Sequence, residues 1–331
     1  VPPRPLVEER GKRAQKNIPG GSENVSPESR LKRVLSAGHF AVTAECGPPK
    51  GADPDLLRKK GNLLKGFVDS VNVTDNQTGV VRLCSLAACA LLREEGLDPV
   101  LQMVTRDRNR IALQSDVLGA SALGIRNILC LSGDHQSFGN QADAKGVFDL
   151  DSIQLVQVIR GMRDSRRILG GEELSRAPDL FIGAAANPFA DPFFYRVLRL
   201  GKKVGAGAEF IQTQCIYDLP KFKEWMGQVR DRGLDRKAFI LGGVTPLKSA
   251  RMAEYMARNV AGMEIPDEVI SRMKSAPSKQ QRAEGLKICA ETIQTLRQIE
   301  GVRGVHIMAI EWEEAVSELV KEAGLWPRPE V

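Results

Sequence analysis

Short apolar stretches alternate with amphipathic segments along most of the chain, from residue 40 onward. The apolar stretches have the length of strands, and their lack of alternation is typical of parallel strands that are covered on both faces. They recur at roughly 30 residues, the size of a βα unit. The strands are expected at 40–46, 68–74, 99–105, 127–132, 181–186, 209–216, 238–244 and 304–310. Helices are expected at 53–65, 82–95, 108–123, 151–165, 193–205, 220–232, 248–258 and 313–323.

Eight alternating units predict an α/β fold of the (β/α)8 TIM barrel type. A doubly wound sheet would place a glycine-rich phosphate turn after its first strand, whereas this chain has Cys46-Gly47-Pro48-Pro49 there. Residues 266–298 are interpreted as extra helices before the eighth strand. We therefore expect a single barrel domain over 39–331.

Residues 1–38 are interpreted as an N-terminal arm followed by a short helix. The arm, 1–27, is rich in Pro, Arg, Lys, Glu and Gly and lacks apolar periodicity. It is either a disordered tail or a segment that docks on a partner subunit. The helix is expected at Pro27–Ala37, with Ser26 as its N-cap.

The carboxyl ends of the strands carry the candidate chemistry, because barrel enzymes build their sites there. The stretch Asn127–Asp134 ends a buried strand in Ser132, Gly133 and Asp134, and the glycine would let the backbone approach a ligand closely. The other polar residues at strand ends include Glu45, Thr74, Gln102, Asn187, Gln214 and His306. Two carboxylates with several amides predict a pocket that can donate protons and orient a heterocycle.

Composition narrows the class of protein. The net charge is +6, but basic and acidic residues are interleaved and aromatic residues make up only 5%, which argues against nucleic-acid binding and allows an anionic small molecule. The six cysteines form no CxxC pair and the three histidines lie in unrelated contexts, so no metal site is expected. Reduced cysteines indicate a cytoplasmic protein. No run approaches the roughly 20 apolar residues that span a membrane.

Several segments, taken in order, resemble the methylenetetrahydrofolate reductase family. They span residues 40–310, and six matches in order are more specific than any one alone. The matching segments are Ala44-Glu45-Cys46-Gly47-Pro48-Pro49, Val73-Thr74-Asp75, Ile128 to Asp134, Lys203-Val204-Gly205-Ala206-Gly207-Ala208, Thr213-Gln214 and Gly304-Val305-His306. The resemblance implies a flavin-containing barrel of one-carbon metabolism that reduces 5,10-methylenetetrahydrofolate to 5-methyltetrahydrofolate.

The resemblance also implies roles for three substrate-binding residues. Glu45 matches the catalytic acid that protonates N10 of the folate; the alternative is an exposed charge at a strand end. Asp134 matches a second catalytic carboxylate, which stabilises the cationic iminium and modulates the flavin; the alternative is a helix N-cap. Gln214 matches a residue that hydrogen-bonds the pterin; the alternative is a buried glutamine that hydrogen-bonds within the sheet.

The remaining matched positions imply a flavin site, with FAD favoured and FMN as the alternative. Arg196, Arg199 and Lys203 share one face of a predicted helix, where cations would neutralise a pyrophosphate; the alternative is a solvated basic face. The cofactor-binding residues so expected are Thr74, Gln102, Ser132, Gly133, Asp134, Phe148, Asp149, Arg196, Arg199, Lys202 and Lys203.

Some positions depart from the family pattern. Ser132 stands where Arg is frequent, Gln102 where His is frequent, and Asn187 where Tyr is frequent. These departures leave the identity of the flavin and the direct use of NAD(P)H open. The sequence does not predict the oligomeric state, and a homo-oligomer is one alternative. The segments Glu45–Gly51 and Thr105–Asn109 look closest to the branch of anaerobes that use the Wood–Ljungdahl pathway, in which a partner subunit with zinc or iron–sulfur centres delivers electrons.

Two other functions are compatible with the pattern. One is a flavin-free, pterin-binding barrel that transfers a methyl group to a corrinoid protein. The other is a non-catalytic subunit that docks a redox partner through the arm.

Overall fold

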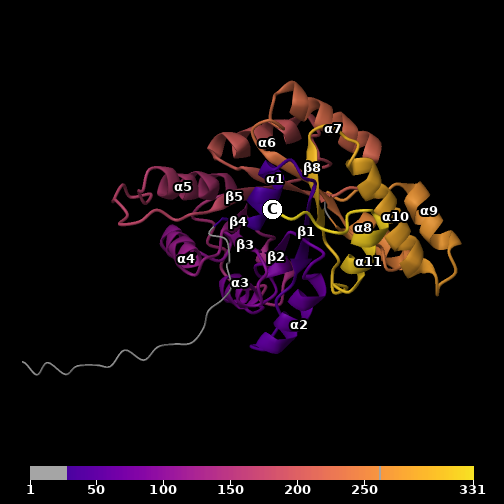
Figure 1. Ribbon diagram of the computed structural model, residues 1–331, viewed down its shortest axis with the longest axis horizontal. Coiled ribbons are helices and arrows are strands. Elements are labelled where there is room, and N and C mark those ends of the chain that lie inside the picture. Colours follow the sequence, from indigo (N-terminus) through magenta and orange to yellow (C-terminus); the bar gives the residue numbers. More distant parts are fainter. Residues whose placement is uncertain (1–27, 261) are drawn as a thin grey trace, which may run out of the picture.

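The computed structural model describes residues 28–260 and 262–331, which form a closed barrel of eight parallel strands in sequential order (Figure 1). The predicted (β/α)8 barrel is thereby confirmed. The predicted arm, 1–27, lies outside the described residues. The strands are β1 (Ala41–Cys46), β2 (Ser70–Val73), β3 (Pro99–Val104), β4 (Asn127–Leu131), β5 (Phe181–Ala186), β6 (Phe210–Cys215), β7 (Phe239–Val244) and β8 (Val302–Ile307).

Helices surround this barrel, and most begin at a polar N-cap. Asn109 caps α4 through hydrogen bonds from two backbone N–H groups, and Asp151 and Gln154 form a capping box at the start of α5. The helices are α1 (Arg30–Ser36), α2 (Pro54–Leu64), α3 (Ser85–Glu94), α4 (Arg110–Ala122), α5 (Ser152–Asp164), α6 (Phe194–Ala206), α7 (Leu219–Asp231), α8 (Ala250–Asn259), α9 (Asp267–Ser275), α10 (Gln281–Leu296) and α11 (Ala315–Glu322).

Helix α1 closes the N-terminal end of the barrel. Its fully buried residues Leu31, Val34 and Leu35 pack in one cluster with inward-facing strand residues such as Phe210. Ser29 caps the helix by accepting a hydrogen bond from the backbone N–H of Lys32. The helix therefore begins three residues later than predicted, and the expected cap, Ser26, lies outside the described residues.

The interior of the barrel changes from apolar at this closed end to polar at the other. Successive inward-facing residues on a strand are two apart, so Phe210 is followed by Gln212 and then Gln214 toward the mouth. The ring of Phe210 fills the space beside Gly183, where a Cβ atom would lie only 2.2 Å from the ring. The inward-facing side chains of β6 thus become polar toward the mouth, where Gln212 and Gln214 line a cavity.

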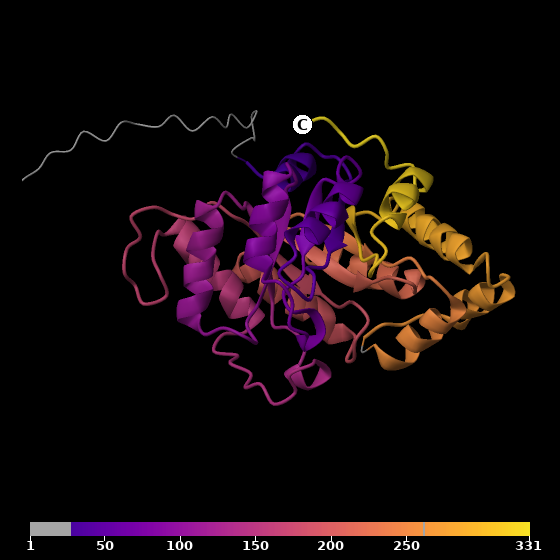
Figure 2. The same cartoon turned by 90° about the horizontal axis from the view of Figure 1, so that it is seen from below.

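The crossover between β7 and β8 differs from the prediction. Helix α10 packs against β7 and β8, whereas α8 packs on α9. Residues of α8, α9 and their loops, among them Met256 and Met273, form a separate apolar cluster with Cys215 of β6 and Ile288 of α10. Figure 2 shows α9 at the outer edge of the molecule. The segment 248–258, expected as the barrel helix, is therefore part of the insertion, and α10 covers the barrel wall instead.

Candidate active site

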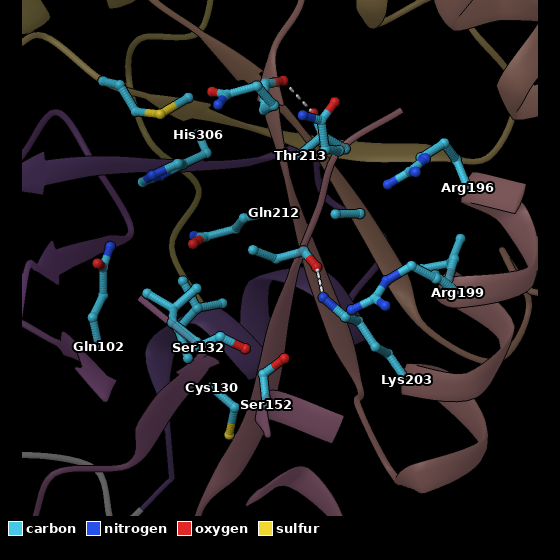
Figure 3. Close-up of a pocket in the computed structure, with 18 of the residues that line it drawn as sticks. Gln102, Cys130, Ser132, Ser152, Arg196, Arg199, Lys203, Gln212, Thr213 and His306 are labelled. Carbon is cyan, nitrogen blue, oxygen red and sulfur yellow. Dashed lines mark hydrogen bonds between the residues drawn. The ribbon is translucent and has the colours of Figure 1, made fainter. Parts of the chain in front are cut away.

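A cavity of about 450 Å³ opens at the carboxyl ends of the strands (Figure 3). It is lined by one carboxylate, several amides and three cationic side chains. Of the site residues predicted from the sequence, the cavity includes Glu45, Gln102, Ser132, Arg196, Arg199, Lys203 and Gln214. These residues come from β1, β3, β6 and α6 and from the end of β4, so the fold brings together segments that are far apart in the chain.

Glu45 lies at the upper end of β1, and its side chain is only 13% exposed. Its Oε1 atom lies 3.8 Å from Nε2 of His306, which is on the neighbouring strand β8. The other ring nitrogen of His306, Nδ1, is 2.9 Å from Oγ1 of Thr43. Thr43 and His306 face each other in the register of β1 and β8. Glu45 is therefore a half-enclosed carboxylate beside a histidine that is itself held by a hydroxyl group.

Helix α6 supplies a positive edge to the cavity through Arg196, Arg199 and Lys203. Burial, and after it the charge of Arg199, lower the pKa of Lys203 to about 8. Ser152, the first residue of α5, lines the same cavity, while the N–H groups at the start of that helix donate to the carboxylate of its N-cap, Asp151. This edge is suited to a phosphate-bearing ligand.

Two amides and a hydroxyl that the sequence predicted also line the cavity. The amide oxygen of Gln214 accepts a hydrogen bond from the backbone N–H of Cys215 at 3.0 Å. The amide NH2 of Gln214 has no hydrogen-bond partner among the described residues. It can therefore donate to a ligand. Gln102 on β3 is 7% exposed and Ser132 follows β4, and both line the cavity.

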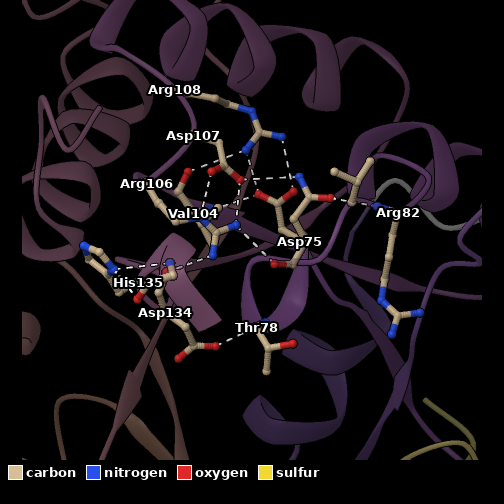
Figure 4. A network of polar contacts seen from close by, with 12 residues as sticks. Asp75, Thr78, Arg82, Val104, Arg106, Asp107, Arg108, Asp134 and His135 are labelled. Carbon is tan, nitrogen blue, oxygen red and sulfur yellow. Dashed lines mark hydrogen bonds and ion pairs between the residues drawn. The ribbon is translucent and has the colours of Figure 1, made fainter. Parts of the chain in front are cut away.

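Asp134 is turned away from the cavity, which differs from the prediction that it projects into a shared pocket. Gly133 has a φ of +84°, and the carbonyl of Asp134 accepts a hydrogen bond from the buried guanidinium of Arg106 at 2.9 Å. The exposed carboxylate accepts a hydrogen bond from the backbone N–H of Thr78 at 3.2 Å (Figure 4). Neither Gly133 nor Asp134 lines the cavity. A catalytic role for Asp134 stays a prediction.

The network of polar contacts in Figure 4 holds the turn after β4, which contains Gly133 and Asp134, in place. Arg106 also donates to the carbonyl of Asn76 and to the carboxylate of Asp107, so it ties together the loops after β2, β3 and β4. The fully buried Asp75 accepts from Arg108 and from the backbone N–H of Val104. These charges are paired, and the loops form one rigid wall beside the cavity.

The other expected flavin residues also lie outside the cavity. Thr74 is 1% exposed, and its Oγ1 has no hydrogen-bond partner among the described residues. Asp149 is paired with Arg110 at 2.7 Å and borders a separate cavity of about 550 Å³. Hydrogen bonds from Arg110 lower the pKa of Asp149 to about 2. Phe148 is 43% exposed, and Lys202 lines a further cavity beside α5.

Thr43, Gln212 and Ser152 contribute to the site and were not predicted. Thr43 precedes Glu45 by two residues, and Gln212 precedes Gln214 by two. Residues two apart on a strand point to the same side, so this spacing could have revealed both. Ser152 had no such signal, because only the packing of α5 brings its first residue to the cavity.

No group of three or more His, Cys, Asp or Glu side chains in 28–260 and 262–331 is arranged to hold a metal ion. Within the same part of the chain, no helix has the length and apolar character needed to cross a bilayer.

The closed parallel barrel and its cavity define a (β/α)8-barrel protein with a polar cavity, lined by one carboxylate and three cations, at the carboxyl ends of its strands. Comparison with known families identifies the family to which the chain belongs. The model of the methylenetetrahydrofolate reductase family matches residues 30–324. The chain belongs to this family, as the resemblance predicted.

Individual relatives agree with the assignment. The chain is 23% identical over 311 residues to a "Probable methylenetetrahydrofolate reductase (NADPH)" of Caenorhabditis elegans, with 90% of this chain and 44% of the relative covered. It is 25% identical over 308 residues to "Methylenetetrahydrofolate reductase 2" of Schizosaccharomyces pombe, with 87% and 46% covered. The chain thus spans less than half the length of these relatives.

A solved structure shares the fold. It is a protein from Clostridium thermocellum described as binding two copies of 5-methyl-5,6,7,8-tetrahydrofolic acid. The TM-score is 0.59 at 15% identity, and the match covers 89% of this chain and 98% of that protein.

Proposed function

We propose that this chain reduces 5,10-methylenetetrahydrofolate to 5-methyltetrahydrofolate with the help of a bound flavin. The observation that carries the proposal is that one cavity holds a half-enclosed carboxylic acid, Glu45, and the cationic edge of α6. Family membership supports the reaction, and the folate named for the solved relative supports the substrate class.

The residues fit a flavin in two respects. The cavity of about 450 Å³ is of the size that holds a flat heterocycle. Arg199 and Lys203 line the cavity where they would hold its phosphate groups, which would offset the burial and the charge of Arg199 that lower the pKa of Lys203. We favour FAD over FMN because three cations line this edge, which suits a pyrophosphate. When bound and reduced, the flavin supplies a hydride to the methylene carbon.

The protein's own residues would handle the proton. As the bond between the methylene carbon and N10 breaks, Glu45 gives its proton to N10 and becomes a carboxylate. His306 lies beside Glu45, so the carboxylate that is left would face an imidazole rather than apolar surface. The free amide NH2 of Gln214 would donate to the pterin ring and orient it.

Electron supply and subunit composition also belong to the proposal. We infer that a partner subunit carrying zinc or iron–sulfur centres delivers electrons, because Ser132 and Gln102 line the cavity where the family frequently has Arg and His. Mixing the flavin-loaded chain with NADH or NADPH under anaerobic conditions tests this. The expected result is slow or no bleaching of the flavin, and rapid bleaching would contradict the need for a partner.

Replacing Glu45 by Gln tests the catalytic assignment. The expected result is retained flavin and a loss of folate reduction of at least about a hundredfold, since general acid catalysis contributes roughly 10²–10⁴-fold. Unchanged turnover would favour the non-catalytic docking subunit. Colourless protein that still binds methyltetrahydrofolate and methylates a corrinoid protein would favour the methyltransferase.

A further inference from the structure

Below Glu45 the barrel interior contains a line of buried polar side chains that the proposed reaction does not use directly. Thr43 on β1 and Asn72 on β2 are 0% exposed, and Gln212 on β6 is 2% exposed. The next layer toward α1 is apolar and includes Val100 and Leu241. Apolar side chains can therefore fill this interior, so packing alone does not require amides here.

The two amides bind each other. The Nδ2 atom of Asn72 donates to Oε1 of Gln212 at 2.7 Å, and Nε2 of Gln212 donates to Oδ1 of Asn72 at 3.1 Å. The second N–H of Gln212 donates to Oγ1 of Thr43, also at 3.1 Å. Both N–H groups and the carbonyl of Gln212 are thus occupied. Because buried amides are stable only when they are bonded, the pair holds one fixed arrangement.

This arrangement constrains Thr43. Its hydroxyl oxygen accepts the N–H of Gln212 and lies 2.9 Å from Nδ1 of His306, with the carbonyl of Val305 at 3.4 Å. His306 is 3% exposed. Its ring orientation therefore depends on Thr43, and the same ring presents Nε2 to Glu45 at 3.8 Å.

We propose that Asn72 and Gln212 are positioning residues for Glu45. The amide pair fixes the hydroxyl of Thr43, the hydroxyl fixes the plane of the His306 ring, and the ring fixes what the Glu45 carboxyl group faces. Asn72 does not line the cavity and Gln212 does, but in this role neither amide needs to touch the substrate. The consequence for turnover rests on the proposed function, whereas the consequence for His306 does not.

Nuclear magnetic resonance of protein labelled with ¹⁵N-histidine tests the proposal directly. The chain has only three histidines, His39, His135 and His306, so the ring signals are few, and a His306→Asn variant assigns them. Gln212→Met keeps the length of the side chain and removes the donor to Thr43. The expected result is a shift and broadening of the His306 ring signals with those of His39 and His135 unchanged.

A double variant separates positioning from stability. Gln212→Met leaves the buried amide of Asn72 without its partner, which lowers the stability of the fold. Asn72→Leu with Gln212→Met removes both amides and should recover most of that stability. The proposal expects the His306 signals to stay shifted in the double variant, and their return to wild-type positions would overturn it.

Asn127→Leu is the matched control. Asn127 is also a fully buried amide, but it bonds Asp98 at 3.0 Å near α1, at the closed end of the barrel. It should lower stability without moving the His306 signals. The proposal is overturned if Gln212→Met leaves these signals unchanged or if the control moves them equally.

Turnover provides a second readout. In Gln212→Met the kcat of folate reduction should fall roughly tenfold to a hundredfold with little change in KM, because a small misplacement of a catalytic group costs up to about that factor. A rise in KM at constant kcat would contradict positioning. If wild-type protein reduces no folate, the proposed function fails while the histidine signals still decide the positioning role.

Discussion

The pH dependence of flavin binding should be set by Lys203. Burial and Arg199 lower the pKa of this lysine from 10.5 to about 8. At about 1.4 kcal/mol for each pH unit, the pocket disfavours the ammonium form by about 3 kcal/mol. A phosphate group bound at the α6 edge would offset this cost and raise the pKa of Lys203 in the complex.

Proton uptake by Lys203 determines whether flavin affinity rises or falls with pH. Below pH 8 the lysine is already charged and binding takes up no proton. Above pH 8 the free protein has lost this proton and the complex regains it, so the affinity should fall by up to about tenfold per pH unit until the pKa of the complex is reached. Quenching of flavin fluorescence, titrated from about pH 7 to about pH 9.5, measures the Kd.

Two variants complete the experiment. Lys203→Met should bind flavin more weakly at pH 7 and should lose the steep rise of Kd above pH 8. Lys202→Met is the matched control, because the neighbouring lysine lines a different cavity and should leave the slope unchanged. The reasoning is refuted if wild-type protein and Lys203→Met show the same pH profile.

Three further predictions concern stability, and each can be measured by urea unfolding. Burial raises the pKa of Asp98 from 3.8 to about 6, so the contribution of its protonated form to the free energy of unfolding is full below pH 3.8 and is lost as the pH rises through 6. Asp98→Asn should flatten this pH dependence, and the same pH profile in the variant and in wild-type protein would contradict the prediction. Gly183→Ala places a Cβ atom 2.2 Å from the Phe210 ring and should destabilise the fold by about 1–3 kcal/mol, whereas a neutral effect would show that the ring moves freely. Arg328→Met leaves the buried Asp69 with only the weaker contact to Arg30 as an ion pair and should cost about 3 kcal/mol, with Arg251→Met as an exposed control; equal effects would argue against the pair.

The barrel was predictable because its signal repeats. Each buried parallel strand appears as a short, predominantly apolar run, and eight such runs separated by amphipathic segments leave few alternative folds. The β7 to β8 crossover was assigned wrongly because α8 and α10 are both amphipathic. Periodicity reports that a helix has an apolar face, and it does not report whether that face meets the barrel or another helix.

The candidate site was predictable only in part, for a similar reason. Glu45, Gln102 and Gln214 lie on strands, so their direction follows from the alternation of side chains, and they line the cavity. Asp134 lies beyond its strand, where Gly133 and the contact with Arg106 set its direction. Those are tertiary features, and no local pattern encodes them.

The most direct test of the proposed function is a single turnover of reduced flavoprotein. The protein is reduced anaerobically, mixed with methylenetetrahydrofolate, and followed by the return of oxidised flavin absorption. We expect fast reoxidation in wild-type protein and reoxidation at least about a hundredfold slower in Glu45→Gln at equal flavin content. Equal rates in the two proteins, or no reoxidation by the folate in either, would contradict the proposal.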